Sequence, residues 1–284
     1  MPPTILALLL AAAMLHAGWN FIVKRAGQKL VFTWWAILMG FVAFCPVLLL
    51  GPRLPLRVWP YALASTLFEV AYFYTLTRAY DRGDFSLVYP IARGTAPGLL
   101  AVWSALFLGE LPRRGGLAGL ALLLLGLITV GGAQWVRRAH VTLGFGGVAA
   151  ALATAICISL YSAIDGGAVR FAPPVTYAVM IQGLIALTSA PIVVARFGRR
   201  VMVAEWRANW PRIIIVGLFS LTTYMLVLIA FSRARVSYAG AVREVSIVFA
   251  ALAGWWLLGE RFGPLRTAGS LLIFAGILTI AIAG

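Results

Sequence analysis

Four charged side chains lie well inside apolar stretches of the sequence: Glu69, Arg93, Arg243 and Glu244. A guanidinium at membrane depth costs about 3 to 15 kcal/mol, so such residues are expected to pair or to bind a substrate. The guanidinium fork binds a carboxylate through two parallel hydrogen bonds. A carboxylate can hold an ammonium group or carry a coupling proton. The four residues together therefore suit a zwitterion such as an amino acid, or a small organic acid.

The two arginines occupy equivalent places in an internal repeat with a constant register of 150 residues. Residues 86–110 read SLVYPIARGTAPGLLAVWSALFLGE, and residues 236–260 read VSYAGAVREVSIVFAALAGWWLLGE. Arg93 matches Arg243, and each stretch ends in Leu-Gly-Glu. This placement predicts a polar cavity between two related halves, lined by both arginines. The alternative is that the glutamates neutralise them in buried structural ion pairs and that the cavity lies elsewhere.

Polar and aromatic side chains near these charges complete the candidate set. His16 and Asn20 lie one helical turn apart in the first apolar run. An interhelical hydrogen bond is the alternative role for His16. Tyrosines on or near the charged helices are candidates for lining the cavity. The predicted substrate-binding residues are Arg93, Arg243, Glu69, Glu244, His16, Asn20, Tyr72, Tyr89, Tyr161 and Tyr238.

The sequence lacks the motifs that would indicate an enzyme or a metal site. It contains no H-E-x-x-H motif, no phosphate-binding glycine loop and no aspartate cluster. Only two histidines are present, and Cys45 and Cys157 both fall inside apolar runs, which favours neither a disulfide framework nor a metal site. We expect no enzyme, no cofactor and no metal. The net charge of +15 is scattered over short loops, so nucleic acid is not expected as a partner either.

Composition places these residues in a lipid bilayer. Hydrophobic residues make up 62% of the 284-residue chain, charged residues 11%, and the mean hydropathy is +0.97. A helix needs about 20 apolar residues to span a bilayer. The sequence predicts an all-α integral membrane protein with ten transmembrane helices. The predicted spans are 3–23, 30–50, 58–80, 86–108, 115–134, 144–165, 174–195, 211–232, 236–258 and 264–283.

The repeat divides the ten helices into two halves of five. Gly119 matches Gly269 and Gly126 matches Gly276, again 150 residues apart, and small residues at such spacing let membrane helices approach closely. Because five is odd, the second half must run through the membrane inverted relative to the first. We expect an N-terminal repeat over residues 1–140 and a C-terminal repeat over 141–284, with the fifth and tenth helices meeting through Gly119 and Gly269. Inverted repeats are typical of secondary transporters that bind substrate at the repeat interface.

The chain resembles the drug/metabolite transporter superfamily in its ten-helix EamA branch, and within it amino acid exporters of the YddG type. The resemblance rests on the five-plus-five layout, the proline-bearing fourth helix, the Leu-Gly-Glu endings at 108–110 and 258–260, and the glycine-spaced helices after them. It implies a secondary-active exporter of small polar metabolites, above all amino acids, working by alternating access. Organic cations, drugs, sugars and nucleobases are the alternative substrates. The expected partners are the small-molecule substrate, the lipid bilayer and a proton as coupling ion, for a monomer in a bacterial-type inner membrane.

The membrane orientation is left open by the sequence. The resemblance implies that both termini are cytoplasmic. The helix ends and loops on the terminal side carry seven basic residues, whereas the opposite side carries fourteen. The positive-inside rule therefore favours the reverse orientation. A channel would not require an inverted repeat with charges at membrane depth, so a transporter is the favoured class.

Overall fold

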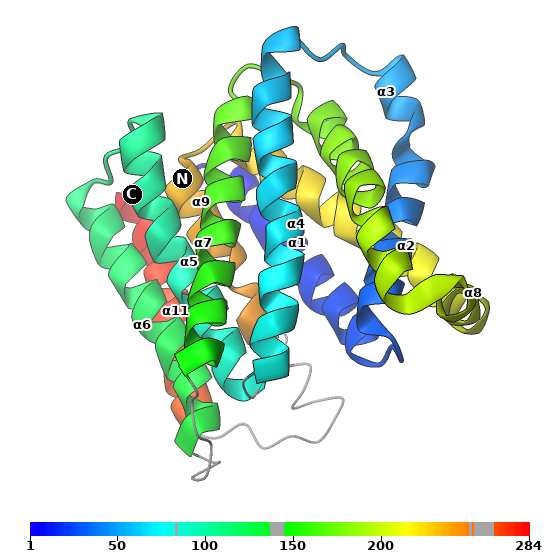
Figure 1. Ribbon diagram of the computed structural model, residues 1–284. Helices are drawn as coiled ribbons and strands as arrows, with labels where there is room; N and C mark the ends of the chain where they lie inside the picture. Colours follow the sequence, from blue (N-terminus) through cyan, green and yellow to red (C-terminus); the bar gives the residue numbers. More distant parts are fainter. Residues whose placement is uncertain (83–84, 137–144, 250–251, 253–263) are drawn as a thin grey trace.

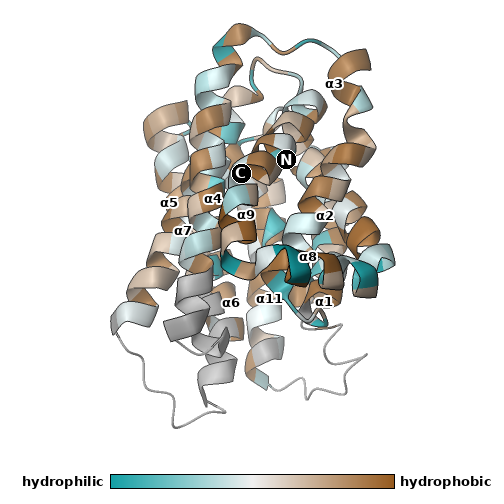
Figure 2. Cartoon of the chain, turned by 45° about the vertical axis from the view of Figure 1, so that its right-hand side comes forward, coloured by the Kyte–Doolittle hydropathy of each residue, from teal (hydrophilic) through white to brown (hydrophobic). Residues whose placement is uncertain are grey.

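The computed structural model describes the backbone of residues 1–82, 85–136, 145–249, 252 and 264–284, and every regular element in this part of the chain is a helix (Figure 1). Among the described residues, four stretches are long and apolar enough to cross a membrane by length and composition: Pro3–Val23, Lys29–Leu50, Gly146–Ala168 and Pro174–Phe231. The expected all-α membrane fold is confirmed. Figure 2 shows hydrophobic residues recurring along the helices.

The helices follow the predicted spans closely. The first half contains α1 (Pro3–Lys24), α2 (Lys29–Phe44), α3 (Pro46–Leu50), a 3₁₀ turn η1 (Leu56–Val58), α4 (Trp59–Arg82), α5 (Phe85–Leu108) and α6 (Arg114–Val136). The second half contains α7 (Phe145–Ala168), α8 (Pro174–Phe231), α9 (Val236–Arg243) and α11 (Pro264–Ala283).

The structure divides one predicted span and joins two others. The span 30–50 is divided into α2 and α3 at Pro46, which occupies the first turn of α3, where its missing N–H costs nothing. The spans 174–195 and 211–232 are joined, because the polar segment between them is helical and only Gly198 leaves the helical conformation, with φ 73°. A glycine tolerates this left-handed backbone without a Cβ clash.

The fifth and tenth predicted helices, α6 and α11, pack side by side through glycines (Figure 1). The prediction that they meet is confirmed, but the predicted pairing of Gly119 with Gly269 is wrong. A Cβ on Gly119 would lie 2.8 Å from the carbonyl oxygen of Gly276, and one on Gly126 would lie 2.7 Å from that of Gly269. In the other direction, a Cβ on Gly276 would lie 2.7 Å from the carbonyl oxygen of Gly119, and one on Gly269 would lie 2.8 Å from that of Gly126. Each helix therefore uses the same two positions crosswise, as a two-fold axis between inverted repeats requires.

The two halves also exchange a helix. α1 packs against α8 and α9 of the second half, whereas α7 packs against α4 and α5 of the first half. The terminal amine of Met1 donates to the carbonyl of Ala281 at 2.9 Å, so the two chain ends lie together at one end of the bundle (Figure 1). This exchange brings side chains that are far apart in sequence, such as those of α1, α5 and α9, to one place.

Candidate functional site

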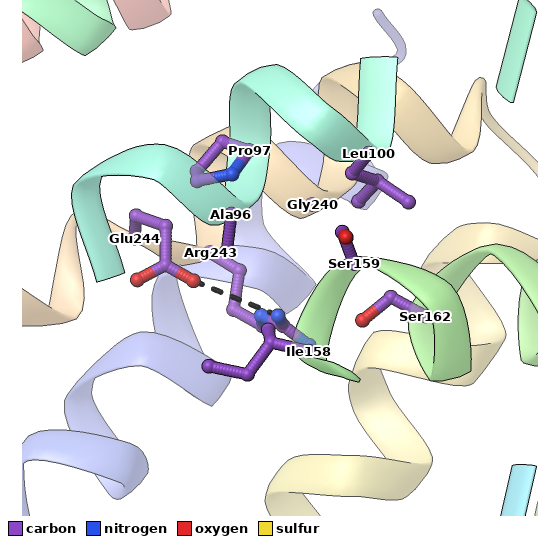
Figure 3. Close-up of a pocket in the computed structure, with 9 residues that line it drawn as sticks. All are labelled: Ala96, Pro97, Leu100, Ile158, Ser159, Ser162, Gly240, Arg243 and Glu244. Carbon is purple, nitrogen blue, oxygen red and sulfur yellow. Dashed lines mark ion pairs between the residues drawn. The ribbon is translucent and has the colours of Figure 1, made fainter. Parts of the chain in front are cut away.

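The two arginines of the repeat converge on one carboxylate. The Nη2 atom of Arg93 lies 3.1 Å from Oε2 of Glu244, and Nη2 of Arg243 lies 3.6 Å from Oε1 of the same residue. Both arginine side chains are 10% exposed and that of Glu244 is 1% exposed. Neither guanidinium faces lipid, and the ion pair considered as an alternative for these residues is observed. Figure 3 shows the pair between Arg243 and Glu244 at the edge of a gap.

His16 of α1 extends this cluster into the first helix. Its Nε2 atom lies 3.2 Å from Nη2 of Arg93. Because a guanidinium only donates hydrogen bonds, Nε2 must be the acceptor, which requires a neutral imidazole protonated on the other ring nitrogen. The interhelical hydrogen bond considered for His16 is therefore present. Asn20 instead donates to the carbonyl of His16 at 2.8 Å, within its own helix.

The backbone of α9 breaks at the charged cluster. The predicted span 236–258 is interrupted because α9 ends at Arg243 and residues 244 and 245 form a turn before helical backbone resumes. The amides of Glu244 and Val245 donate to the carbonyls three residues earlier, at 3.0 and 3.1 Å, as in a 3₁₀ turn. This segment is rich in valine and isoleucine, whose β-branching weakens the helix. Broken helices at membrane depth are typical of substrate and ion sites in transporters.

A narrow gap lies beside Arg243, between α5, α7 and α9. Its empty space is about 160 Å³. Pro97 of α5 borders the gap and removes the hydrogen bond that the carbonyl of Arg93 would otherwise accept. The residues that line the gap are Ala96, Pro97, Leu100, Ile158, Ser159, Ser162, Gly240, Arg243 and Glu244 (Figure 3).

Two buried donors at this gap have no hydrogen-bond partner among the described residues. They are Nε of Arg243 and Oγ of Ser162. The neighbouring Ser159 is satisfied, since its hydroxyl accepts from Trp103 Nε1 at 3.0 Å and donates to the carbonyl of Ile156 at 2.9 Å. Buried polar atoms are almost always paired, and exceptions often mark a missing ligand or water.

The tyrosines predicted for the site lie in different parts of the structure. Tyr72 and Tyr161 meet across α4 and α7, with ring centroids 6.4 Å apart. Tyr238 lies away from the arginines at the terminal end of the bundle, where its hydroxyl accepts from the amide of Arg113 at 3.0 Å. Tyr238 precedes Arg243 by five residues on α9, so the length of the helix separates the two side chains. The side chain of Tyr89 lies outside the described residues.

The two remaining acidic groups lie on neighbouring helices. Glu69 of α4 is half-buried and, in the described part of the chain, forms no hydrogen bond or ion pair. It lies within electrostatic range of Asp165 and Arg243. Asp165 is not among the residues predicted for the site. The structure places it inside the bundle, fully buried. A lone acidic residue in an apolar run was the signal that could have identified it.

The terminal end of the bundle is tied together by Glu110 of the first Leu-Gly-Glu motif. Arg170, after the end of α7, donates to Oε1 of Glu110 at 2.7 Å and to the carbonyl of Leu108 at 2.9 Å. The amide of Ser237, in the first turn of α9, donates to Oε2 of Glu110 at 3.3 Å. A carboxylate at a helix N-terminus satisfies a free amide and complements the helix dipole. The equivalent Glu260 lies outside the described residues.

Inverted halves and a helix broken at a charged core are typical of membrane transporters. The described residues contain no group of histidine, cysteine, aspartate and glutamate that could hold a metal ion. The chain belongs to the EamA-like transporter family, whose sequence model matches residues 3–132 and 145–282. It is therefore a multi-pass membrane protein that transports small molecules, and it is not an enzyme.

Comparison with solved structures supports the same fold. One crystal structure, titled only "Crystal structure of protein", superposes with a TM-score of 0.79 at 20% sequence identity, covering 100% of both chains. At this identity the likeness concerns the fold alone. No curated protein matches the chain significantly.

Proposed function

We propose that the protein is a secondary-active exporter of small zwitterions, above all amino acids, in a bacterial-type inner membrane. The observation that carries the proposal is the pair of unpartnered donors, Arg243 Nε and Ser162 Oγ, at one gap. Both can donate to a carboxylate, and a guanidinium binds one through two parallel bonds. Pairing with a substrate carboxylate would remove the free-energy cost of leaving these buried donors without a hydrogen bond.

The carboxylates of the site indicate that the substrate also carries a positive charge. Glu244 is already shared between Arg93 and Arg243. Glu69 has no such partner in the described structure and lies within electrostatic range of Arg243. It is the group we assign to the substrate ammonium. A substrate with both charges fits this arrangement better than an organic cation, which the arginines would repel.

Transport is by alternating access, in which substrate enters when the helices around the gap separate. The break in α9 and Pro97 in α5 provide two places where helix segments can move independently. In this mechanism the helices on either side of the gap open to one membrane face at a time, around arginines that stay within the bundle.

The test is counterflow into proteoliposomes that contain the purified full chain. Amino acids, purines, sugars and organic cations are each offered as the labelled substrate. We expect saturable counterflow of amino acids. Counterflow restricted to organic cations, sugars or purines would overturn the proposed substrate and favour those alternatives.

Substitutions at the guanidinium sharpen this test. Arg243→Lys keeps the charge but loses the fork, so it should weaken amino acid binding by about 1–3 kcal/mol, the range for a hydrogen bond to a charged group. Arg93→Ala should abolish transport while the protein still inserts. Arg207→Lys is the matched control, because Arg207 is exposed between the two membrane segments of α8. Normal transport by both site variants would show that the arginines do not bind substrate.

A further inference from the structure

Asp165 forms a second polar centre, separate from the arginine cluster. Its side chain is 0% exposed. Each of its oxygens accepts a hydrogen bond from a tyrosine hydroxyl, Oδ1 from Tyr177 at 2.8 Å and Oδ2 from Tyr224 at 2.7 Å. The two tyrosines come from the segments of α8 on either side of Gly198, so one carboxyl joins α7 to both membrane segments of α8. Nothing in the binding of a zwitterion at Arg243 requires this arrangement.

The partners of Asp165 differ in kind from those of Glu244. Glu244 faces guanidinium groups, which can only donate hydrogen bonds. Asp165 has no salt bridge in the described part of the chain. A tyrosine hydroxyl can donate to a carboxylate and can equally accept from a carboxylic acid. The Asp165 carboxyl can therefore form hydrogen bonds with the tyrosines in either protonation state, whereas a protonated Glu244 would have no acceptor among the guanidinium groups.

The charged groups around Asp165 connect it to the proposed substrate site. α4 presents Glu69, and α9 presents Arg243, each within electrostatic range of Asp165. Arg93 on α5 is engaged by Glu244 and His16. A substrate ammonium beside Glu69 would stabilise the ionised form of Asp165. Without substrate, that stabilisation is lost and Asp165 can take up a proton.

We infer that Asp165, held by Tyr177 and Tyr224, is the proton-binding site that couples export to a proton gradient. The inference rests on the proposed function for the identity of the exported substrate. In the substrate-free state one proton passes from water to the Asp165 carboxylate, and the resulting acid donates its hydrogen to a tyrosine oxygen. When substrate binds from the other face, the carboxyl returns that proton to water. One proton therefore crosses the membrane inward for each substrate exported.

The decisive experiment compares Asp165→Asn with Asp165→Glu in proteoliposomes. Counterflow at equal pH requires no net proton movement, whereas transport driven by a pH gradient does. Asp165→Asn should retain counterflow and lose its stimulation by the gradient, and Asp165→Glu should keep both. A purely structural role predicts the opposite order, because asparagine preserves the volume of the side chain and glutamate does not. Either that reversed order or full gradient stimulation in Asp165→Asn would overturn the inference.

A second measurement makes the result independent of the substrate. Infrared spectra of the substrate-free protein, recorded as the pH is changed, show the carbonyl band of buried protonated carboxyl groups. The band assigned to Asp165 should be missing in Asp165→Asn and present in Glu205→Gln. Glu205 is a matched control because it is a buried carboxylate whose partners, the amide of Gln28 at 3.2 Å and Asn209 at 2.8 Å, tie the opposite end of the bundle.

The two hypotheses can fail separately. If the wild type shows no amino acid counterflow, the proposed function fails, and the infrared titration still decides whether Asp165 binds a proton. If amino acids are transported but Asp165→Asn leaves the infrared band unchanged, the proton site is refuted and the proposed function stands.

Discussion

The crosswise glycine contact between α6 and α11 can be tested by adding a single methyl group. In Gly119→Ala the new Cβ would lie 2.8 Å from the carbonyl oxygen of Gly276 and 2.9 Å from the amide of Ile280. Ordinary contact begins at 3.4 Å. The nearest atom is Cγ1 of Ile280 at 2.7 Å, and the next two are these backbone atoms of a helix, which cannot rotate away as a flexible side chain can. The two helices must therefore separate by about 3.4 − 2.8 = 0.6 Å at this point.

The expected cost follows from this separation. A radial gap of about 0.5–1 Å forfeits roughly a quarter to a half of the dispersion energy of each atom pair that it separates. In a bilayer, dispersion is a main force between helices, because lipid is as apolar as the side chains. Inserting extra methyl groups into a well-packed core typically costs about 1–3 kcal/mol. We expect Gly119→Ala to destabilise the protein by an amount within that range.

Variants of the partner glycine test how the destabilisation depends on the pairing as well as how large it is. Gly276→Ala should cost about as much as Gly119→Ala, because it closes the same contact from the other side. The double variant should cost less than the sum, since the first substitution has already separated the helices there. Gly18→Ala is the control: no atom lies within 4 Å of its added Cβ, and alanine favours a helix over glycine. It should be neutral or slightly stabilising.

The assay is unfolding of the purified protein in detergent, followed by circular dichroism against temperature and against increasing denaturing detergent. Equal stability of Gly119→Ala and wild type would refute the close packing. Strict additivity of Gly119→Ala and Gly276→Ala would refute the pairing of these two glycines, even if each variant alone is destabilised.

Two further predictions concern the charged groups. Glu244→Gln should destabilise the protein by about 3–5 kcal/mol, because it leaves Arg93 and Arg243 buried without their shared carboxylate; unchanged unfolding in the same assay would contradict this. Glu110→Gln should let the terminal end of the bundle open more readily, because it weakens the link between Arg170 and the start of α9. Pulsed electron paramagnetic resonance on spin labels at the terminal ends of α5 and α9 should then report longer distances. An unchanged distance distribution would show that Glu110 does not hold this end closed.

Much of the fold could be predicted because its signals are linear along the chain. Runs of about 20 apolar residues mark the spans, since a bilayer fixes the length of a helix that crosses it. The 150-residue register identifies the two halves, and their odd number of helices implies inversion. The cost of burying a guanidinium likewise singled out Arg93 and Arg243 without knowledge of any neighbour.

Side-chain partnerships could not be predicted, because they depend on which helix faces which. The exchange of α1 and α7 between the halves is a long-range packing outcome, and it brings His16 to Arg93. The two-fold axis pairs Gly119 with Gly276, although the linear register matches it with Gly269. In the same way the sequence offered two glutamates as partners for the arginines, and only the packing of α5 against α9 selected Glu244.

The sequence by itself therefore determined that the chain is a ten-helix inverted repeat with charges at membrane depth, because membrane thickness and the cost of burying charge act on each segment separately. Only the tertiary structure decided that Asp165 lies between two tyrosine hydroxyls and Glu244 between two guanidinium groups. The physical reason is that a buried carboxyl is defined by its partners, and those partners come from helices up to about 150 residues apart in the chain.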